Sequence, residues 1–135
     1  MQVTNKDFDS LSWHDSKVYA VTLPDADYCI KIDIDFILEW GQKENGKGYQ
    51  FLVAPAILQF EGVSNLAIKI EMDNYGDIYI DEIKRQNQRR SPNGQVFLWD
   101  FVMLLDKGEI TFTAYGFKQE LTNSPKWGEG QIYDR

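Results

Sequence analysis

The run Trp13-His14-Asp15 contains the only histidine of the chain, next to a carboxylate, and is therefore a possible site. An imidazole paired with an acid could transfer protons. Adjacent residues of an extended chain point to opposite faces, so we expect His14 and Asp15 to be badly placed to form a hydrogen-bonded dyad with each other. We expect Trp13 to close one end of the core, with His14 and Asp15 satisfying backbone groups beside it. No G-x-S-x-G pattern or reactive-cysteine motif is present to complete a triad with His14.

Three carboxylates, Asp33, Asp35 and Glu39, alternate with apolar residues along a single stretch. We expect them to lie on the water-facing side of a long strand. Such a row could attract a basic protein, because opposite potentials speed encounter and select partners. It could equally be a face that keeps the protein soluble. The sequence therefore makes these residues candidates for partner binding.

The stretch that begins at Val96 and ends at Leu105 is apolar on both faces if it forms a strand. Such a strand has to be covered twice, and we expect the second cover to be the C-terminal tail, a ligand or a second copy in a homodimer. Asp100 interrupts one face, so it has a structural partner such as an arginine, lies at the rim, or acts as an acid with a raised pKa. Trp99, Asp100 and Phe101 are further candidates for partner binding.

Metal ligands are scarce in this chain. Structural zinc takes four cysteine or histidine ligands, and only His14 and Cys29 are available. Oxygen ligands for calcium gather in one turn, but the D-x-[DN]-x-[DN]-G pattern is absent, and a solvated acidic turn explains them. The residues in this turn are Asp73, Asn74, Asp77 and Asp81. There is no P-loop or G-x-G-x-x-G motif, so we expect neither a metal nor a cofactor.

Charge narrows the range of partners. Fourteen basic and 21 acidic residues give a net charge of −7, which disfavours nucleic acid and favours a basic partner. Residues 84–90 hold four positive charges and could contact phosphate, but a charged rim that protects an edge strand explains them as well. Cys29 is the only cysteine, so no disulfide can form within the chain, which indicates a reducing compartment or one in which redox conditions do not matter. There is no secretory signal and no apolar run of membrane-spanning length, so we expect a cytoplasmic protein that does not enter a membrane.

The elements that position these residues are predicted to be strands. From residue 28 to residue 40, apolar and polar side chains alternate, as in an antiparallel strand with one buried face. The even-numbered residues, Trp40 included, are expected in the core. Similar segments recur about every ten residues, which predicts an all-β antiparallel sandwich or barrel of seven or eight strands.

The 135 residues are expected to form one domain. A short helical turn is predicted near the N-terminus, capped by Thr4 or Asn5 and carrying Phe8 and Leu11 into the core. Pro55 predicts an edge, a bulge or a bend, because proline has no amide hydrogen to donate. Residues 118–135 contain Pro125, two glycines and scattered aromatics, and are expected to form an irregular tail.

A longer pattern supports a comparison with known proteins. The residues Phe51-x-Val53-Ala-Pro55-Ala-x-Leu58-x-Phe60, the run Trp13-His14-Asp15 and the segment Gly116-Phe117-Lys-Gln119 resemble small uncharacterised bacterial domains of this length. In size, acidity and β pattern the chain is similar to immunity proteins of bacterial toxin systems. That resemblance implies a role in binding a partner. It identifies neither the toxin nor any functional residue.

Together these features predict a non-enzymatic binding protein that acts through a surface, with a basic protein as partner. The alternative is a small-ligand-binding barrel or sandwich in which Trp99, Phe101 and Trp127 line an apolar pocket. A hydrolase built on His14 is a third hypothesis.

Overall fold

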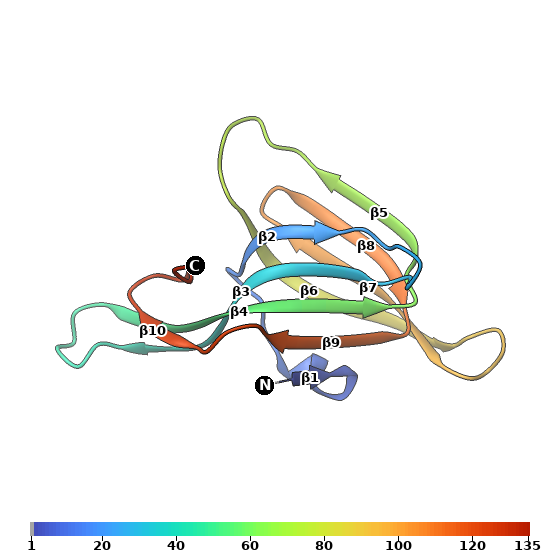
Figure 1. Cartoon of the computed structure of the whole chain (residues 1–135), viewed down its shortest axis with the longest axis horizontal. Helices are drawn as coiled ribbons and strands as arrows, with labels where there is room; N and C mark the ends of the chain where they lie inside the picture. Colours follow the sequence, from blue (N-terminus) through green and yellow to red (C-terminus); the bar gives the residue numbers. More distant parts are fainter. Residues whose placement is uncertain (1) are drawn as a thin grey trace.

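The structure is a computed structural model that describes residues 2–135 and consists of one antiparallel sheet of ten strands (Figure 1). Along the sheet the order is β1-β9-β4-β3-β2-β6-β7-β8-β5, and β10 also pairs with β4. The strands are β1 (Gln2–Thr4), β2 (Lys17–Thr22), β3 (Ile30–Gln42), β4 (Tyr49–Glu61), β5 (Ser64–Ile70), β6 (Ile78–Arg90), β7 (Phe97–Leu105), β8 (Gly108–Ala114), β9 (Gly116–Leu121) and β10 (Lys126–Gly128).

The all-β antiparallel fold predicted from the sequence is confirmed, but the sheet has ten strands and the sequence predicted only seven or eight. Two strands, β1 and β10, are three residues long, which is too short for alternation to reveal. The sheet also does not close into a barrel, because β1 and β5 lie at its two ends. It curls instead, so that β6, β7 and β8 lie behind β2, β3 and β4 in Figure 1.

Aromatic rings fill the space between the two halves of the curled sheet. Phe60 is in contact with Phe101, Phe112 and Phe117, with ring centroids 5.0, 4.8 and 5.5 Å apart. All four side chains are buried. Phe8 adds an edge-on contact to Phe101, with centroids 5.5 Å apart. The interior is therefore packed with side chains contributed by both halves.

The N-terminal helical turn is confirmed as η1 (Asn5–Ser10), a 3-10 helix. The Asp7 carboxylate accepts a hydrogen bond from the backbone amide of Thr4 at 3.0 Å. Phe8 points from this turn into the core, as predicted. No helix of the described residues is long and apolar enough to cross a membrane.

The long strand β3 confirms most of the predicted alternation and departs from it at its end. Ile30, Ile32 and Ile34 are fully buried, but Trp40 is 68% exposed. The pairing of β3 with β4 shifts by one residue between Ile37 and Glu39. A shift of one residue moves side chains to the other face of a sheet, and for this reason the expectation that Trp40 belongs to the core was wrong.

The C-terminal segment is more regular than predicted. Residues 118–121 belong to β9 and residues 126–128 form β10, whereas residues 122–125 and 129–135 lie outside the strands. Pro55 lies between the two contacts, because β9 pairs with β4 from Ala56 onward and β10 pairs with it up to Val53. The proline without an amide hydrogen thus sits where β4 changes partner.

Candidate binding groove

A groove of about 540 Å³ lies between η1, the turn at His14 and the outer part of the β3–β4 hairpin. Three residues that the sequence predicts to form a site, His14, Asp15 and Glu39, line this groove. Its walls include apolar side chains from two strands and polar side chains from the turn and the C-terminal segment. Its lining includes Leu11, His14, Asp15, Glu39, Trp40, Phe51 and Gln131.

Trp13 and its two neighbours turn out to have separate roles. Trp13 is buried, and its indole Nε1 donates to Oε1 of Gln119 at 2.8 Å, so the prediction that it closes the core is confirmed. His14 and Asp15, in contrast, lie in the groove wall. Of these three residues, Trp13 is in the interior, whereas His14 and Asp15 face solvent.

The His14 and Asp15 side chains lie closer together than an extended chain would allow, but within residues 2–135 no hydrogen bond joins them into a dyad. Nε2 of His14 lies 3.5 Å from Oδ1 of Asp15. The chain here is a turn, with Asp15 at a φ of 67° and its amide donating to the carbonyl of Ile80 at 2.8 Å. The argument from opposite faces holds only for extended chain. Nδ1 of His14 donates to the carbonyl oxygen of Asp81 at 3.1 Å, so both ring nitrogens have neighbours.

Exposed aromatic side chains border the groove on the β3–β4 hairpin. Trp40 lies directly opposite Phe51 in the ladder, and its ring meets that of Tyr49 edge-on with centroids 5.4 Å apart. Tyr49 is 55% exposed. The hairpin projects from the body of the sheet in Figure 1. Trp40 and Tyr49 were not among the predicted site residues, although the glycine-rich loop between them marks a projecting hairpin.

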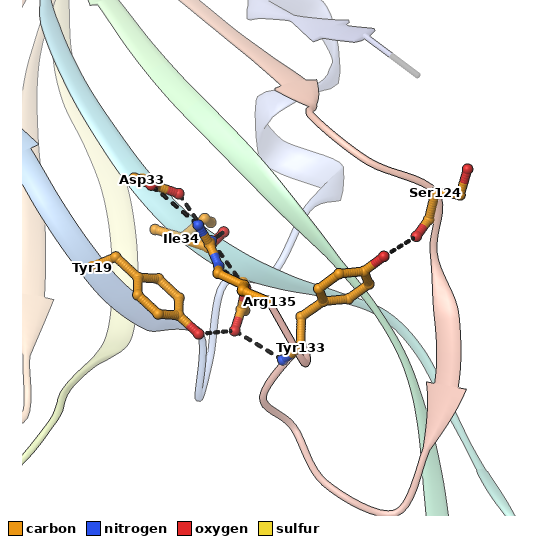
Figure 2. A network of polar contacts seen from close by, with 7 residues as sticks. Tyr19, Asp33, Ile34, Ser124, Tyr133 and Arg135 are labelled. Carbon is orange, nitrogen blue, oxygen red and sulfur yellow. Dashed lines mark hydrogen bonds and ion pairs between the residues drawn. The ribbon is translucent and has the colours of Figure 1, made fainter.

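The C-terminal segment forms one side of the groove. Nε2 of Gln131 donates to Oδ2 of Asp15 at 3.4 Å. Further along, the Tyr133 side chain is buried and its hydroxyl donates to the carbonyl oxygen of Ser124 at 2.9 Å (Figure 2). A salt bridge between Lys43 and Glu129 ties the start of this segment to the hairpin loop.

The segment is anchored by Arg135, which reaches back to β3 (Figure 2). Its guanidinium donates to Asp33 at 2.9 Å and to Asp35 at 3.0 Å, and it lies over the ring of Tyr19 at 3.7 Å. Asp35 also accepts from the Tyr19 hydroxyl at 2.5 Å and from the backbone amide of Tyr133 at 2.9 Å. Burial and the hydrogen bond to Asp35 raise the pKa of Tyr19 to about 12.

The row of three carboxylates is therefore not the free acidic face that was predicted. Asp35 is fully buried, and Asp33 shares the guanidinium of Arg135. Only Glu39 of the three is exposed, and it lies in the groove wall. The sequence offered no signal for this, because Arg135 is 100 residues from Asp35 along the chain.

The second predicted binding cluster is also divided by the fold. Phe101 is fully buried in the core and cannot contact a partner. Trp99 is half-buried under the guanidinium of Arg85, 4.6 Å from its ring. Asp100 accepts from Asn87, Thr113 and Arg89, and the side-chain hydrogen bond from Asn87, followed by that from Thr113, lowers its pKa. The structural-partner interpretation of Asp100 is confirmed and the raised pKa is not.

The three aromatics expected to line a ligand pocket do not meet. Phe101 lies in the core, Trp99 stacks on Arg85, and Trp127 lies on β10 opposite Leu52 of β4. The arrangement therefore gives no support to a pocket built from these residues.

Three covers were predicted for the second face of the strand ending at Leu105: the C-terminal tail, a ligand or a second copy. The structure contradicts the tail, and the other two stay predictions. The C-terminal segment lies on β3, away from β7. The second face of β7 carries Leu98, Val102 and Leu104, which are half-buried. Val102 lies between Lys84 and Thr111 in the ladders, so neighbouring polar side chains cover the stripe in part.

The basic residues of 84–90 are mostly engaged within the chain. The Arg85 guanidinium lies between the rings of Phe8 and Trp99, and that of Arg90 lies over Phe97. Arg89 pairs with Asp100. Within residues 2–135 no group of three or more His, Cys, Asp or Glu side chains is arranged to hold a metal ion.

Comparisons with protein-family models, with curated proteins and with solved structures find no match to this chain.

Proposed function

We propose that this chain is a non-enzymatic binding protein that holds a basic segment of a protein partner in the groove between His14 and Trp40. The observation that carries the proposal is the exposure of Trp40, 68%, at a groove whose lining includes the carboxylates of Asp15 and Glu39. Large aromatic side chains supply much of the binding energy at protein interfaces. Here one is presented to solvent on a projecting hairpin.

Charge supports a basic occupant. Glu39 and Asp15 lie in the groove wall, and the chain as a whole carries a net charge of −7. A negative surface attracts a positively charged partner and speeds its association. An arginine or lysine side chain could place its charge beside Glu39 and its methylene groups on Trp40.

The contacts of His14 favour a binding role over a catalytic one. Its two ring nitrogens face the Asp81 carbonyl and the Asp15 carboxylate. Within residues 2–135 no serine, threonine or cysteine side chain forms a hydrogen bond to the ring. A hydrolase would need such a nucleophile next to the imidazole.

The specific form of the proposal is an immunity-type role in the bacterial cytoplasm. A protein of this kind neutralises a toxin by covering part of its surface. The resemblance in size, acidity and β pattern to immunity proteins supports this form, and the groove supplies the surface. Co-expression with a toxic basic protein encoded next to this chain would test it directly.

The groove itself is tested with two peptides of nine residues, one rich in arginine and one rich in glutamate. We expect the basic peptide alone to bind, with affinity that falls as salt is added. Trp40→Ala should weaken binding about tenfold or more, as expected for an aromatic residue central to an interface. The measurement is the dissociation constant by calorimetry.

Matched controls lie away from the groove. Tyr75→Ala removes an aromatic side chain that is fully exposed in the 71–77 loop, and it should leave binding unchanged. Glu39→Lys should abolish binding of the basic peptide, whereas Glu109→Lys on β8 should not. Equal effects of Trp40→Ala and Tyr75→Ala, or binding of both peptides alike, would refute the groove as the binding site.

A further inference from the structure

The strand β5 forms one end of the sheet and pairs with β8 alone among the described strands (Figure 1). The strand at the opposite end, β1, has only three residues, whereas β5 has seven. A long edge strand presents unpaired backbone donors and acceptors to any strand that approaches it. The edge at β5 is therefore the larger open ladder of this sheet.

The direction of the free backbone groups follows from one hydrogen bond. The amide of Glu71 donates to the carbonyl of Lys107 at 2.9 Å, so the ladder with β8 continues to this residue. Successive residues of an antiparallel strand point their backbone groups to opposite sides. The N–H and C=O groups of Ile68 and Ile70 therefore point away from β8, toward the free side.

Apolar side chains accompany this free edge. Ile68, Ile70 and Met72 are 39%, 36% and 42% exposed, and their alternation places them on one face. The opposite face carries Lys69 and Glu71. Isolated exposed apolar residues are common, but three in a row beside an unpaired backbone indicate a contact surface.

We propose that two copies of this chain join edge to edge through β5, antiparallel, with Ile70 opposite Ile70 of the second copy. In this register Ile68 lies opposite Met72, so apolar side chains face apolar side chains on one side of the joined sheet. On the other side Lys69 lies opposite Glu71. The pattern of this short segment thus complements itself in both hydrophobicity and charge.

Neighbouring registers fit less well. Centring the pair on Lys69 would bring two lysines together, and like charges directly opposite each other are unfavourable. Centring it on Ile68 would place Glu71 opposite Asn65, which has a φ of 54° beside the irregularity between Ser64 and Ala67. The regular part of the edge begins at Ala67, and the register centred on Ile70 uses that part.

Cysteine cross-linking tests the register. Residues in a hydrogen-bonded antiparallel pair have Cα atoms about 5.5 Å apart, which is within the range that a disulfide spans. Ile70→Cys should therefore form a covalent dimer on mild oxidation. Ile68→Cys should not, because two copies of residue 68 would be about four residues apart along the strand, more than 13 Å. The native Cys29 is buried, and the unsubstituted chain controls for its reaction.

Charge reversal tests the same register in solution by sedimentation over a range of concentrations. We expect the unsubstituted chain to form a dimer, and K69E and E71K each to weaken it about fivefold or more. The double variant K69E/E71K restores opposite charges and should restore the dimer. Circular dichroism of each variant shows whether it remains folded.

Four results would overturn the proposal. A strictly monomeric chain at millimolar concentration would do so, as would cross-linking of Ile68→Cys in place of Ile70→Cys. A double variant no better than either single variant would contradict the charge pairing. Finally, dissociation of the dimer by Leu104→Lys, with no effect of K69E, would place the contact on the second face of β7.

Discussion

Asp35 on β3 and Asp100 on β7 each lie within a strand and each pair with an arginine, but their surroundings differ. The Asp35 side chain is fully buried, whereas that of Asp100 is 34% exposed. Arg135 comes from the far end of the chain, and Arg89 comes from the strand next to β7. Similar ion pairs therefore have different roles. The pair at Asp35 fixes a distant segment of the chain, whereas the pair at Asp100 gives a strand carboxylate a partner from the neighbouring strand.

The purpose of the Asp35 pair is visible in what it holds. The segment fixed by Arg135 also carries Gln131, which contacts Asp15 in the groove wall. Asp35 therefore contributes to the shape of the proposed binding groove without being in it. Asp100, in contrast, has three partners on β6 and β8 and holds no distant segment.

The largest effect on the free energy of unfolding is expected when the arginine that pairs with Asp35 is removed. Arg135→Met should lower the free energy of unfolding by about 3 kcal/mol, because it leaves a buried carboxylate without its cation. Urea unfolding at pH 7 measures the change. Lys126→Met is a matched control, since Lys126 is a cation of the same C-terminal region that lies over the Tyr133 ring and pairs with no buried carboxylate. Equal losses in the two variants would contradict a special role of Asp35.

An intermediate effect on stability is expected at high pH, where the Tyr19 hydroxyl that donates to Asp35 loses its proton. The pKa of Tyr19 is raised from 10.0 to about 12, so the folded state holds the phenol proton more tightly than the unfolded state does. This contribution to stability is complete below pH 10 and is lost as the pH rises toward about 12. Tyr19→Phe cannot titrate, so its stability should fall less than that of the unsubstituted chain over this range. Parallel curves from urea unfolding at several pH values would speak against the contact with Asp35.

The smallest effect is expected at the exposed pair. Arg89→Met should cost less than about 1 kcal/mol, because exposed ion pairs contribute little and Asn87 and Thr113 still donate to Asp100. The measurement is again urea unfolding, with added salt as a second condition. A loss as large as that in Arg135→Met would remove the distinction between the two sites.

The fold class was predictable because alternation is a local property. The isoleucines of β3 show the period of two on their own, and burial of one face follows from it. The exposure of the Trp40 side chain was not predictable from alternation, because the register shift before Glu39 depends on how β3 pairs with β4. The close approach of His14 to Asp15 was not predictable for a related reason, since the turn at Asp15 is held by the carbonyl of Ile80 on β6.

The amino-acid sequence by itself determined that the chain forms an antiparallel sheet, that Trp13 and Phe8 enter its core and that the molecule is acidic, because periodicity and charge are properties of neighbouring residues and of composition. Only the tertiary structure decided which carboxylates remain free. Asp35 and Glu39 look alike in the alternating pattern, yet a guanidinium from residue 135 covers the first and solvent reaches the second. Contacts between residues 100 positions apart are set by the path of the whole chain, and no local pattern specifies them.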